Sequence, residues 1–283
     1  MIVPAHNERL MIGRCIDSVL HGAPLDELEL LVVCNGCTDG TEDVACAASP
    51  HARVLKTEIA SKHAALNLGD ETARGSVRVY LDADTVVSPG TLAAVALALE
   101  RPGGLVAAPE IRFDDSACSW PARQFHRVWR ASPYFGPGLV GAGFYALSPE
   151  GRSRFDRFPP IVADDAFIQS LFAPEDRTTV PGYTFTPLLP TTLRAMLHVH
   201  LRHYGARAEL QQWWSEAGMG VPLGWSDHSK TWVLDLSRSP ANWPGLACFG
   251  LVKIAAAVLG PLSRRRGRMV RWNRDDASRR AAV

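Results

Sequence analysis

The sequence lacks a strong charge imbalance, a cysteine framework and a signal peptide. Its 283 residues carry 30 Lys and Arg against 29 Asp and Glu, so the net charge of +1 gives no overall attraction for nucleic acid. The six cysteines are scattered and do not resemble a disulfide framework. Because the chain opens directly on a strand-like run, we expect a reducing, cytoplasmic location.

Two further absences narrow the class of protein. Residues 34–37 form a C-x-x-C pair, but no second pair follows at zinc-finger spacing, which argues against a structural zinc site. No internal repeat is visible in the sequence. Since only Met1 precedes the first strand-like run, a natural start further upstream stays open.

Apolar runs alternate with helical spacing over the first hundred residues. The pattern predicts strands over residues 2–5, 29–33, 53–56, 77–81 and 104–109, and helices over residues 8–20, 41–48, 62–71 and 88–100. Ser88 is the expected cap of the last of these helices, with Pro89 in its first turn. Repeated β-α-β units predict an α/β, Rossmann-like fold with a mostly parallel sheet covered by helices on both faces.

The second half of the chain has a looser pattern. It predicts a strand over residues 144–147 and helices over residues 118–130, 164–172, 192–212 and 245–259, and it leaves residues 218–244 unassigned. We therefore expect a catalytic domain over residues 1–212 and a helical C-terminal extension over residues 213–283.

Asp82 and Asp84 follow the predicted strand 77–81 as a D-x-D pair. Residues two apart on a strand point to the same side, so the two carboxylates can face one point. A pair of ionised carboxylates favours a cation between them, and oxygen ligands favour Mg²⁺ or Mn²⁺. The alternative is an ordinary surface turn that ends the strand.

Polar clusters follow three of the predicted strands, at residues 4–8, 34–41 and 82–84. Ligands of open parallel sheets bind beyond the carboxyl ends of the strands, where these clusters are expected to meet. Each cluster alone also fits turn chemistry. At this edge Asp39 could accept hydrogen bonds from a base or ribose, and Lys62 is either close to a phosphate or a solvated surface lysine.

The motifs at residues 3–8, 33–41, 62–69 and 81–84 resemble, in order and spacing, those of family-2 glycosyltransferases with the GT-A fold. The resemblance covers roughly residues 1–175. It implies an enzyme that binds a nucleotide-diphospho-sugar, most often a UDP-sugar, through Mn²⁺ or Mg²⁺ and inverts the anomeric centre. The same resemblance implies a donor site formed by Pro4, Ala5, Asn7, Glu8, Asn35, Asp39, Lys62, Asp82, Ala83 and Gly143.

The resemblance also implies individual roles. Pro4, Ala5, Glu8 and Asp39 would contact the nucleoside. Asp82 would lie near the ribose and the metal, and Asp84 would be the metal ligand on the diphosphate.

The family's acid pair stands at Asp164-Asp165, where Asp replaces the usual first Glu. The resemblance implies that Asp165 is the general base, with Asp164 beside it as the less favoured choice. Inversion needs such a base, because the acceptor hydroxyl loses its proton as it attacks. The alternative is a helix cap and a first-turn acid. Residues 141–143 match the family's Gly-rich stretch beside the sugar and acceptor, or else form a tight turn into the next strand.

The chain departs from the processive members of the family. It lacks their Gln-x-x-Arg-Trp motif and their multiple membrane spans, which favours transfer of a single sugar. Residues 192–207 and 272–279 resemble a branch from bacterial envelope or exopolysaccharide pathways, which implies a carbohydrate or lipid-linked acceptor. His200 is a weak candidate for a further metal ligand, and the alternative is a solvated polar helix face.

Residues 245–262 are marginal for a membrane span, because Lys253 and Pro261 interrupt about 18 residues. An apolar helix followed by an arginine cluster favours peripheral contact with the inner face of a membrane. The alternative is a core or oligomer-interface helix. The cluster consists of Arg264, Arg265, Arg266, Arg268, Arg271 and Arg274.

Two other functions stay open at this point. A nucleotidyltransferase would have a Gly-rich, Arg-containing phosphate loop after the first strand, and residues 4–8 do not form one. A catalytically inactive scaffold of the same fold would not need the acids that this chain retains.

Overall fold

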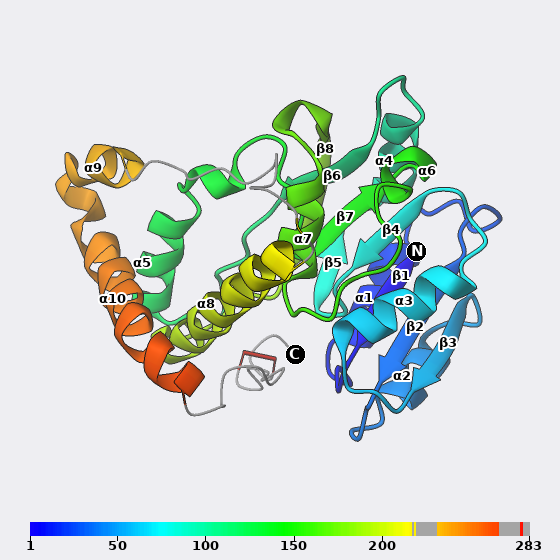
Figure 1. Cartoon of the computed structure of the whole chain (residues 1–283), viewed down its shortest axis with the longest axis horizontal. Coiled ribbons are helices and arrows are strands. Elements are labelled where there is room, and N and C mark those ends of the chain that lie inside the picture. Colours follow the sequence, from blue (N-terminus) through cyan, green and yellow to red (C-terminus); the bar gives the residue numbers. More distant parts are fainter. Residues whose placement is uncertain (217, 219–230, 266–277, 280–283) are drawn as a thin grey trace. The chain divides into compact units, whose positions relative to one another are not determined.

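The computed structural model describes residues 1–216, 218, 231–265 and 278–279 (Figure 1). The chain divides into two compact units. Unit 1 consists of Met1–Arg112 and Pro137–Pro187, and unit 2 consists of Phe113–Gly136 and Leu188–Val283. The predicted boundary at residue 212 falls inside helix α8 (Leu193–Glu216), so the compact units differ from the predicted division.

Unit 1 is built on an eight-stranded sheet in the order β3-β2-β1-β4-β7-β6-β8-β5. β1 pairs in parallel with β2 and with β4, and β2 pairs in parallel with β3, which confirms the predicted α/β arrangement in the first half of the chain. The strands are β1 (Ile2–Ala5), β2 (Leu30–Asn35), β3 (Ala52–Thr57), β4 (Arg78–Leu81), β5 (Thr85–Val87), β6 (Val106–Ile111), β7 (Phe144–Leu147) and β8 (Arg177–Pro187).

The other half of the sheet is mixed. β7 lies antiparallel between β4 and β6, β6 runs parallel to β8, and β5 runs antiparallel to β8. The sequence did not predict β5 or β8. β5 has only three residues, and β8 is rich in threonine and largely lacks buried side chains, so neither has an apolar run.

Two helices of unit 1 begin later in the chain than the sequence predicts. α1 starts at Ile12 rather than Glu8, and residues 9–11 before it form a turn in which the Glu8 carbonyl accepts a hydrogen bond from the Met11 N–H. α4 starts at Thr91 rather than after Ser88, because Gly90 has a φ of 75°. The helices are α1 (Ile12–Leu20), α2 (Thr41–Ala48), α3 (Lys62–Thr72), α4 (Thr91–Leu99), α6 (Pro149–Arg152), α7 (Asp164–Leu171) and the short 3₁₀ turn η2 (Pro174–Asp176).

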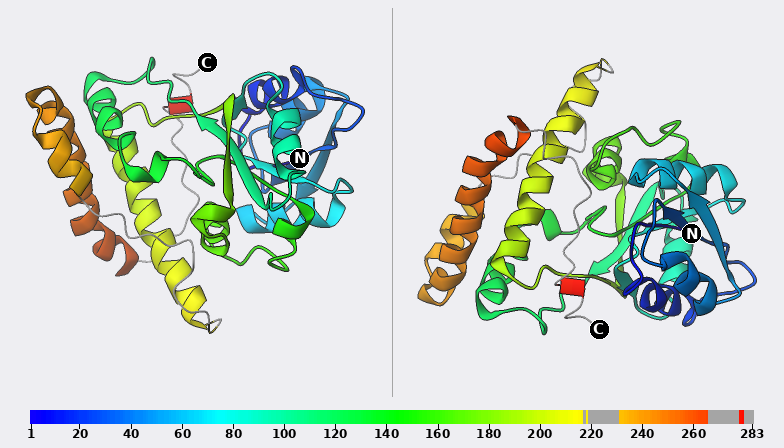
Figure 2. Two further views of the ribbon diagram at one scale, coloured as in Figure 1. Left: turned by 90° about the horizontal axis from the view of Figure 1, so that it is seen from above. Right: turned by 90° about the horizontal axis from the view of Figure 1, so that it is seen from below.

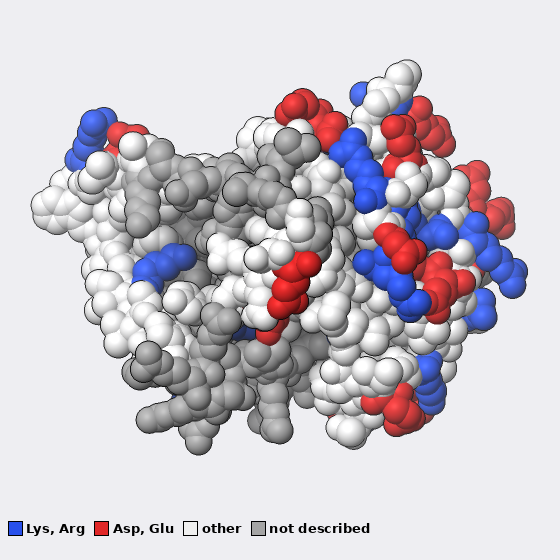
Figure 3. All heavy atoms as spheres, in the orientation of Figure 1, with Lys and Arg blue, Asp and Glu red and all other residues white. Residues whose placement is uncertain are grey.

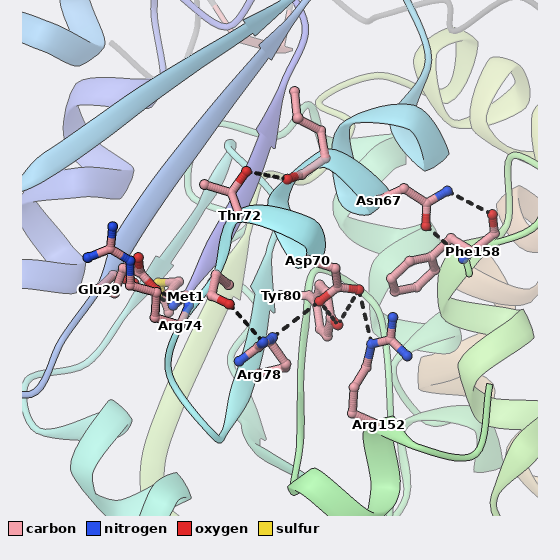
Figure 4. A network of polar contacts seen from close by, with 12 residues as sticks. Met1, Glu29, Asn67, Asp70, Thr72, Arg74, Arg78, Tyr80, Arg152 and Phe158 are labelled. Atoms are coloured by element: carbon pink, nitrogen blue, oxygen red, sulfur yellow. Dashed lines mark hydrogen bonds and ion pairs between the residues drawn. The ribbon is translucent and has the colours of Figure 1, made fainter. Parts of the chain in front are cut away.

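A buried polar network holds α3 in place (Figure 4). Asp70 accepts a hydrogen bond from the Tyr80 hydroxyl at 2.7 Å and forms ion pairs with Arg78 and Arg152 at 3.4 and 3.1 Å. Asn67 exchanges two hydrogen bonds with the backbone of Phe158, at 3.1 and 2.9 Å. These contacts fix the helix whose first residue is Lys62.

Unit 2 is helical. It contains α5 (Trp120–Trp129), η1 (Pro133–Phe135), α8, α9 (Thr231–Ser237), η3 (Pro240–Asn242) and α10 (Trp243–Arg265). Figure 2 shows α10 lying alongside α8. A hydrophobic cluster in the core of unit 2 contains Phe125 from α5, Met196 from α8, and Cys248 and Val252 from α10. The stretch Pro240–Pro261 contains an 18-residue window with a mean hydropathy of 1.6, and it is long and apolar enough to cross a membrane by length and composition.

Candidate active site

The loops that follow β1 and β2 are joined by hydrogen bonds. Asn7, with a φ of 55°, accepts a hydrogen bond from the Thr38 N–H through its side-chain oxygen at 2.6 Å. The Asn35 side chain donates to the carbonyl of Ala5 at 2.9 Å. The first two polar clusters therefore lie together at one edge of the sheet, as the sequence predicts.

Asp39 ties the first loop to the start of α2. Its carboxylate accepts hydrogen bonds from the N–H groups of Arg9, at 3.2 Å, and Thr41, at 3.1 Å. The Glu8 N–H in turn donates to the Thr41 hydroxyl at 2.7 Å. Glu8 is buried beneath this loop. Its contact with the nucleoside stays a prediction.

The C-x-x-C pair also has a place in these loops, which the sequence did not reveal. The Cys37 thiol lies 3.3 Å from both the Asn7 N–H and the Ala5 carbonyl. A hydrogen bond from Cys34 lowers the pKa of Cys37 to about 6. Cys37 is therefore part of the framework that shapes the first loop.

The D-x-D pair forms the connection between β4 and β5. The Asp82 N–H donates to the Gly143 carbonyl at 2.9 Å, and the Thr85 N–H donates to the Asp82 carbonyl at 3.0 Å. Ala83 is buried, whereas Asp82 and Asp84 are half-buried. The segment is a turn, as the alternative predicted. It connects two strands of the sheet, and its hydrogen bond to the Gly143 carbonyl holds it beside β7.

Lys62 joins the D-x-D pair to the acid pair. Its Nζ atom lies 2.7 Å from Oδ1 of Asp82 and 2.8 Å from Oδ1 of Asp164. Burial alone would lower the pKa of Lys62, but the charges of Asp164 and Asp82 outweigh it and hold this pKa above its usual value. The interpretation of Lys62 as a solvated surface lysine is therefore wrong.

Asp164 is buried and fully engaged. One oxygen faces Lys62, and the other accepts a hydrogen bond from the Tyr145 hydroxyl at 3.1 Å. Burial raises the pKa of Asp164 to about 6, against the opposing effect of the Lys62 charge. The interpretation of Asp164 as the helix cap is wrong, since Ala163 is the N-cap of α7. Nothing in the sequence pattern pointed to Tyr145.

Asp165 lies against the glycine turn that precedes β7. Gly141, Ala142 and Gly143 all have positive φ values, of 111°, 56° and 111°. A Cβ atom on Gly141 would lie 2.6 Å from the Cβ atom of Asp165. The turn is tight, as one interpretation expected, and Gly143 and Asp165 both line one pocket. Its place beside a sugar and an acceptor stays a prediction.

We expect Gly141→Ala to lower the rate of the sugar transfer that the sequence predicts, by displacing Asp165. A methyl group at this position must push the acid away, and a shift of about 1 Å can cost roughly a hundredfold in rate. The matched control is Gly182→Ala, because Gly182 has a φ of 81° and nothing within 4 Å of a new Cβ atom. Steady-state kinetics of both variants test this. Equal losses would show that backbone strain alone is responsible.

One pocket brings the predicted residues together. Pro4, Lys62, Asp82, Gly143 and Asp165 are among the residues that line it. Tyr145, Asp164 and the apolar side chains of Leu66, Tyr80 and Leu81 complete the lining. The pocket therefore joins the ends of β1 and β4 to the start of α7.

Three carboxylates lie near Cys15 in α1, and two of them are those of the D-x-D pair. Burial raises the pKa of Cys15, and the charges of Asp84, Asp82 and Glu8 raise it further. The Cys15 thiol also contacts the Asp82 carbonyl at 3.8 Å. The structure thus brings both D-x-D acids close to the loop that follows β1.

Asp82 and Asp84 offer oxygen donors of the type that Mg²⁺ and Mn²⁺ prefer. Among the described residues, no group of three or more His, Cys, Asp or Glu side chains is arranged to hold a metal ion. Magnesium-type sites commonly use one or two carboxylates and complete their shell with substrate phosphates and water. The D-x-D pair fits a metal of that kind.

His200 lies in unit 2, away from any solvated face. It is 7% exposed, and its ring centre lies 5.5 Å from that of Phe125. Burial lowers its pKa to about 3. The interpretation of His200 as a solvated residue on a polar helix face is therefore wrong, and its role as a metal ligand stays a prediction.

Comparison with known proteins gives the family. Residues 1–145, slightly more than half of the 283 residues, match the family model for Glycosyl transferase family 2. The chain belongs to this family. Its match to Glycosyltransferase AglE of Haloferax volcanii is 34% identical over 89 residues, which are 30% of this chain and 29% of that protein. The match therefore spans less than a third of the length of this relative.

The chain is similar to solved structures, one of which shares its fold. The mannosyltransferase PcManGT from Pyrobaculum calidifontis is 22% identical, with a TM-score of 0.59 over 99% of this chain and 84% of that one. Glucosyl-3-phosphoglycerate synthase from Mycobacterium tuberculosis is 20% identical, with a TM-score of 0.47 over 64% and 68% of the two chains. The first of these confirms the predicted GT-A type of fold for the family-2 chain.

Proposed function

We propose that this family-2 chain transfers one sugar from a nucleotide-diphospho-sugar to an acceptor hydroxyl with inversion at the anomeric carbon. The observation that carries the proposal is the Lys62 bridge. It joins Asp82, from the expected donor side, to Asp164, the neighbour of the expected base, in one pocket. A site with this arrangement can hold the donor and the attacking group side by side.

The loops after β1 and β2 bind the nucleoside in this proposal. Pro4 lines the pocket, and Asp39 and Asn7 fix the loops at its edge. Asp84 holds a divalent cation, Mn²⁺ or Mg²⁺, which neutralises the diphosphate leaving group when bound. In support, PcManGT is described in complex with GDP-Man and Mn²⁺. A UDP-sugar is the favoured donor class.

Asp165 takes the proton of the acceptor hydroxyl. Asp164 is less suited to that role although its pKa is raised, because Lys62 and Tyr145 engage both of its oxygens. Asp165 instead lines the pocket, and its Oδ1 accepts a hydrogen bond from the Ala166 N–H at 2.8 Å. A base must reach the proton that it removes, which favours Asp165. Asp164 and Lys62 position it.

The acceptor is a carbohydrate or a lipid-linked sugar in the cytoplasm, as in the bacterial envelope or exopolysaccharide branch. Transfer of a single sugar is expected, because the processive motif is missing from the sequence.

Product analysis tests this function against its rivals. The chain is incubated with Mn²⁺ and a set of UDP-, GDP- and dTDP-sugars, with water or a simple glycoside as acceptor. Release of nucleoside diphosphate, with an inverted product by NMR, is the expected result. Release of pyrophosphate from a nucleoside triphosphate and a sugar 1-phosphate, supplied in a parallel reaction, would identify a nucleotidyltransferase. Binding without turnover would identify an inactive scaffold.

A further inference from the structure

Helix α10 is apolar on all sides. Between Trp243 and Pro261 its only charged residue is Lys253. One side of the helix, formed by Cys248, Val252 and Ala256, is buried in unit 2, where α10 packs on α5 and α8. A helix that is apolar all round is normally buried all round.

The opposite side of α10 is exposed. Leu251, Ile254 and Val258 are 65%, 66% and 60% exposed, and their spacing of three and four residues places them on one helical face. We name these three residues the outer face. Only 28% of the 18-residue apolar window within Pro240–Pro261 is buried. In Figure 3 the edge of the molecule at α10 is largely free of charged side chains.

An arginine-rich segment follows this helix directly. Residues 264–274 contain six arginines and no acidic residue. Its first two arginines are the last residues of α10, and Ser278, further along the chain, accepts a hydrogen bond from the Thr191 N–H through its hydroxyl at 2.8 Å. Arg266, Arg268, Arg271 and Arg274 themselves lie outside the described residues.

We propose that the outer face of α10 docks on the surface of an anionic lipid bilayer. A bilayer surface offers an apolar layer and negative charge next to each other, which matches an apolar helix face followed by arginines. A second copy of the chain is a poorer partner, because its net charge of +1 provides no excess of acid for six arginines. The contact is peripheral, since Cys248, Val252 and Ala256 are already packed on protein.

This inference is independent of the proposed sugar transfer, since it concerns unit 2 alone. The test is co-sedimentation of the full chain with vesicles of phosphatidylcholine, with and without phosphatidylglycerol. The chain is expected to bind the vesicles that contain phosphatidylglycerol, and about 0.5 M salt should weaken the binding because it screens the arginines. The double variant Leu251→Glu, Ile254→Glu should bind at least roughly tenfold more weakly.

The matched control is Leu97→Glu. Leu97 is 61% exposed on α4 in unit 1, so it tests the same chemistry on an unrelated surface, and it should bind like the unmodified chain. Circular dichroism establishes that each variant is folded. Absence of binding to phosphatidylglycerol vesicles, or equal binding by the double variant, overturns the proposal. A double variant that changes only the oligomeric state by light scattering would identify a second copy as the partner instead.

Discussion

Replacing Asp165 with Asn should abolish sugar transfer while donor binding persists. The amide keeps the size of the side chain, but it cannot take the proton of the acceptor hydroxyl. Loss of a general base costs about 10²- to 10⁴-fold in rate. We therefore expect kcat to fall by that factor and the dissociation constant for the nucleotide sugar to stay nearly unchanged, as measured by steady-state kinetics and calorimetry.

A matched control for this variant is Asp17→Asn, since Asp17 is an exposed acid on α1. It should have the activity of the unmodified chain. Full activity in Asp165→Asn, together with inactivity in Asp164→Asn, would transfer the role of base to Asp164.

Replacing Lys62 with Met should cause the largest loss of stability. Lys62 is the cation that faces the buried carboxylate of Asp164 at 2.8 Å. Removing one partner of a buried ion pair leaves an uncompensated charge and costs about 3–5 kcal/mol. Asp82 adds little to this figure, because its side chain is 38% exposed and water screens it. The free energy of unfolding in urea measures the loss.

The loss in Lys62→Met should also depend on pH. The pKa of Asp164 is about 6 in the folded chain, against about 3.9 for an unperturbed aspartate, so the folded state holds its proton longer and stability falls as pH rises between these values. Without Lys62 this pKa rises further, and the fall continues above pH 6. The variant should therefore lose more stability relative to the unmodified chain at about pH 8 than at about pH 5.

The control for Lys62→Met is Lys56→Met, which removes an exposed lysine from β3. It should leave the unfolding free energy nearly unchanged at both pH values. Equal losses in Lys62→Met at the two pH values would contradict the assignment of the effect to Asp164.

The sequence predicts the donor side of the site because its signals are local. Each of the loops at residues 4–8, 34–41 and 82–84 directly follows an apolar strand, and parallel strands bring such loops to one edge. The D-x-D pair and the acid pair at the start of α7 are recognisable for the same reason.

The contacts between the D-x-D pair and the acid pair could not be predicted from the sequence. Lys62, Asp82 and Asp164 meet only because β7 inserts antiparallel beside β4, and this pairing places Gly143 and Tyr145 next to the D-x-D turn. β7 itself was predicted, but nothing in its four residues specifies a partner or a direction. The burial of His200 depends likewise on packing with α5, which helical spacing alone does not reveal.

Metal-dependent binding of a nucleotide sugar is the most direct test of the central claim. The melting temperature of the full chain is measured with UDP, GDP, dTDP and their sugars, each with Mn²⁺ and with a chelator, and again for Asp84→Ala. A donor at about 100 times its Kd should stabilise the chain by about 2.7 kcal/mol with Mn²⁺, and much less with chelator or in Asp84→Ala. Absence of stabilisation by every nucleotide, or a shift that is the same without metal and without Asp84, would contradict it.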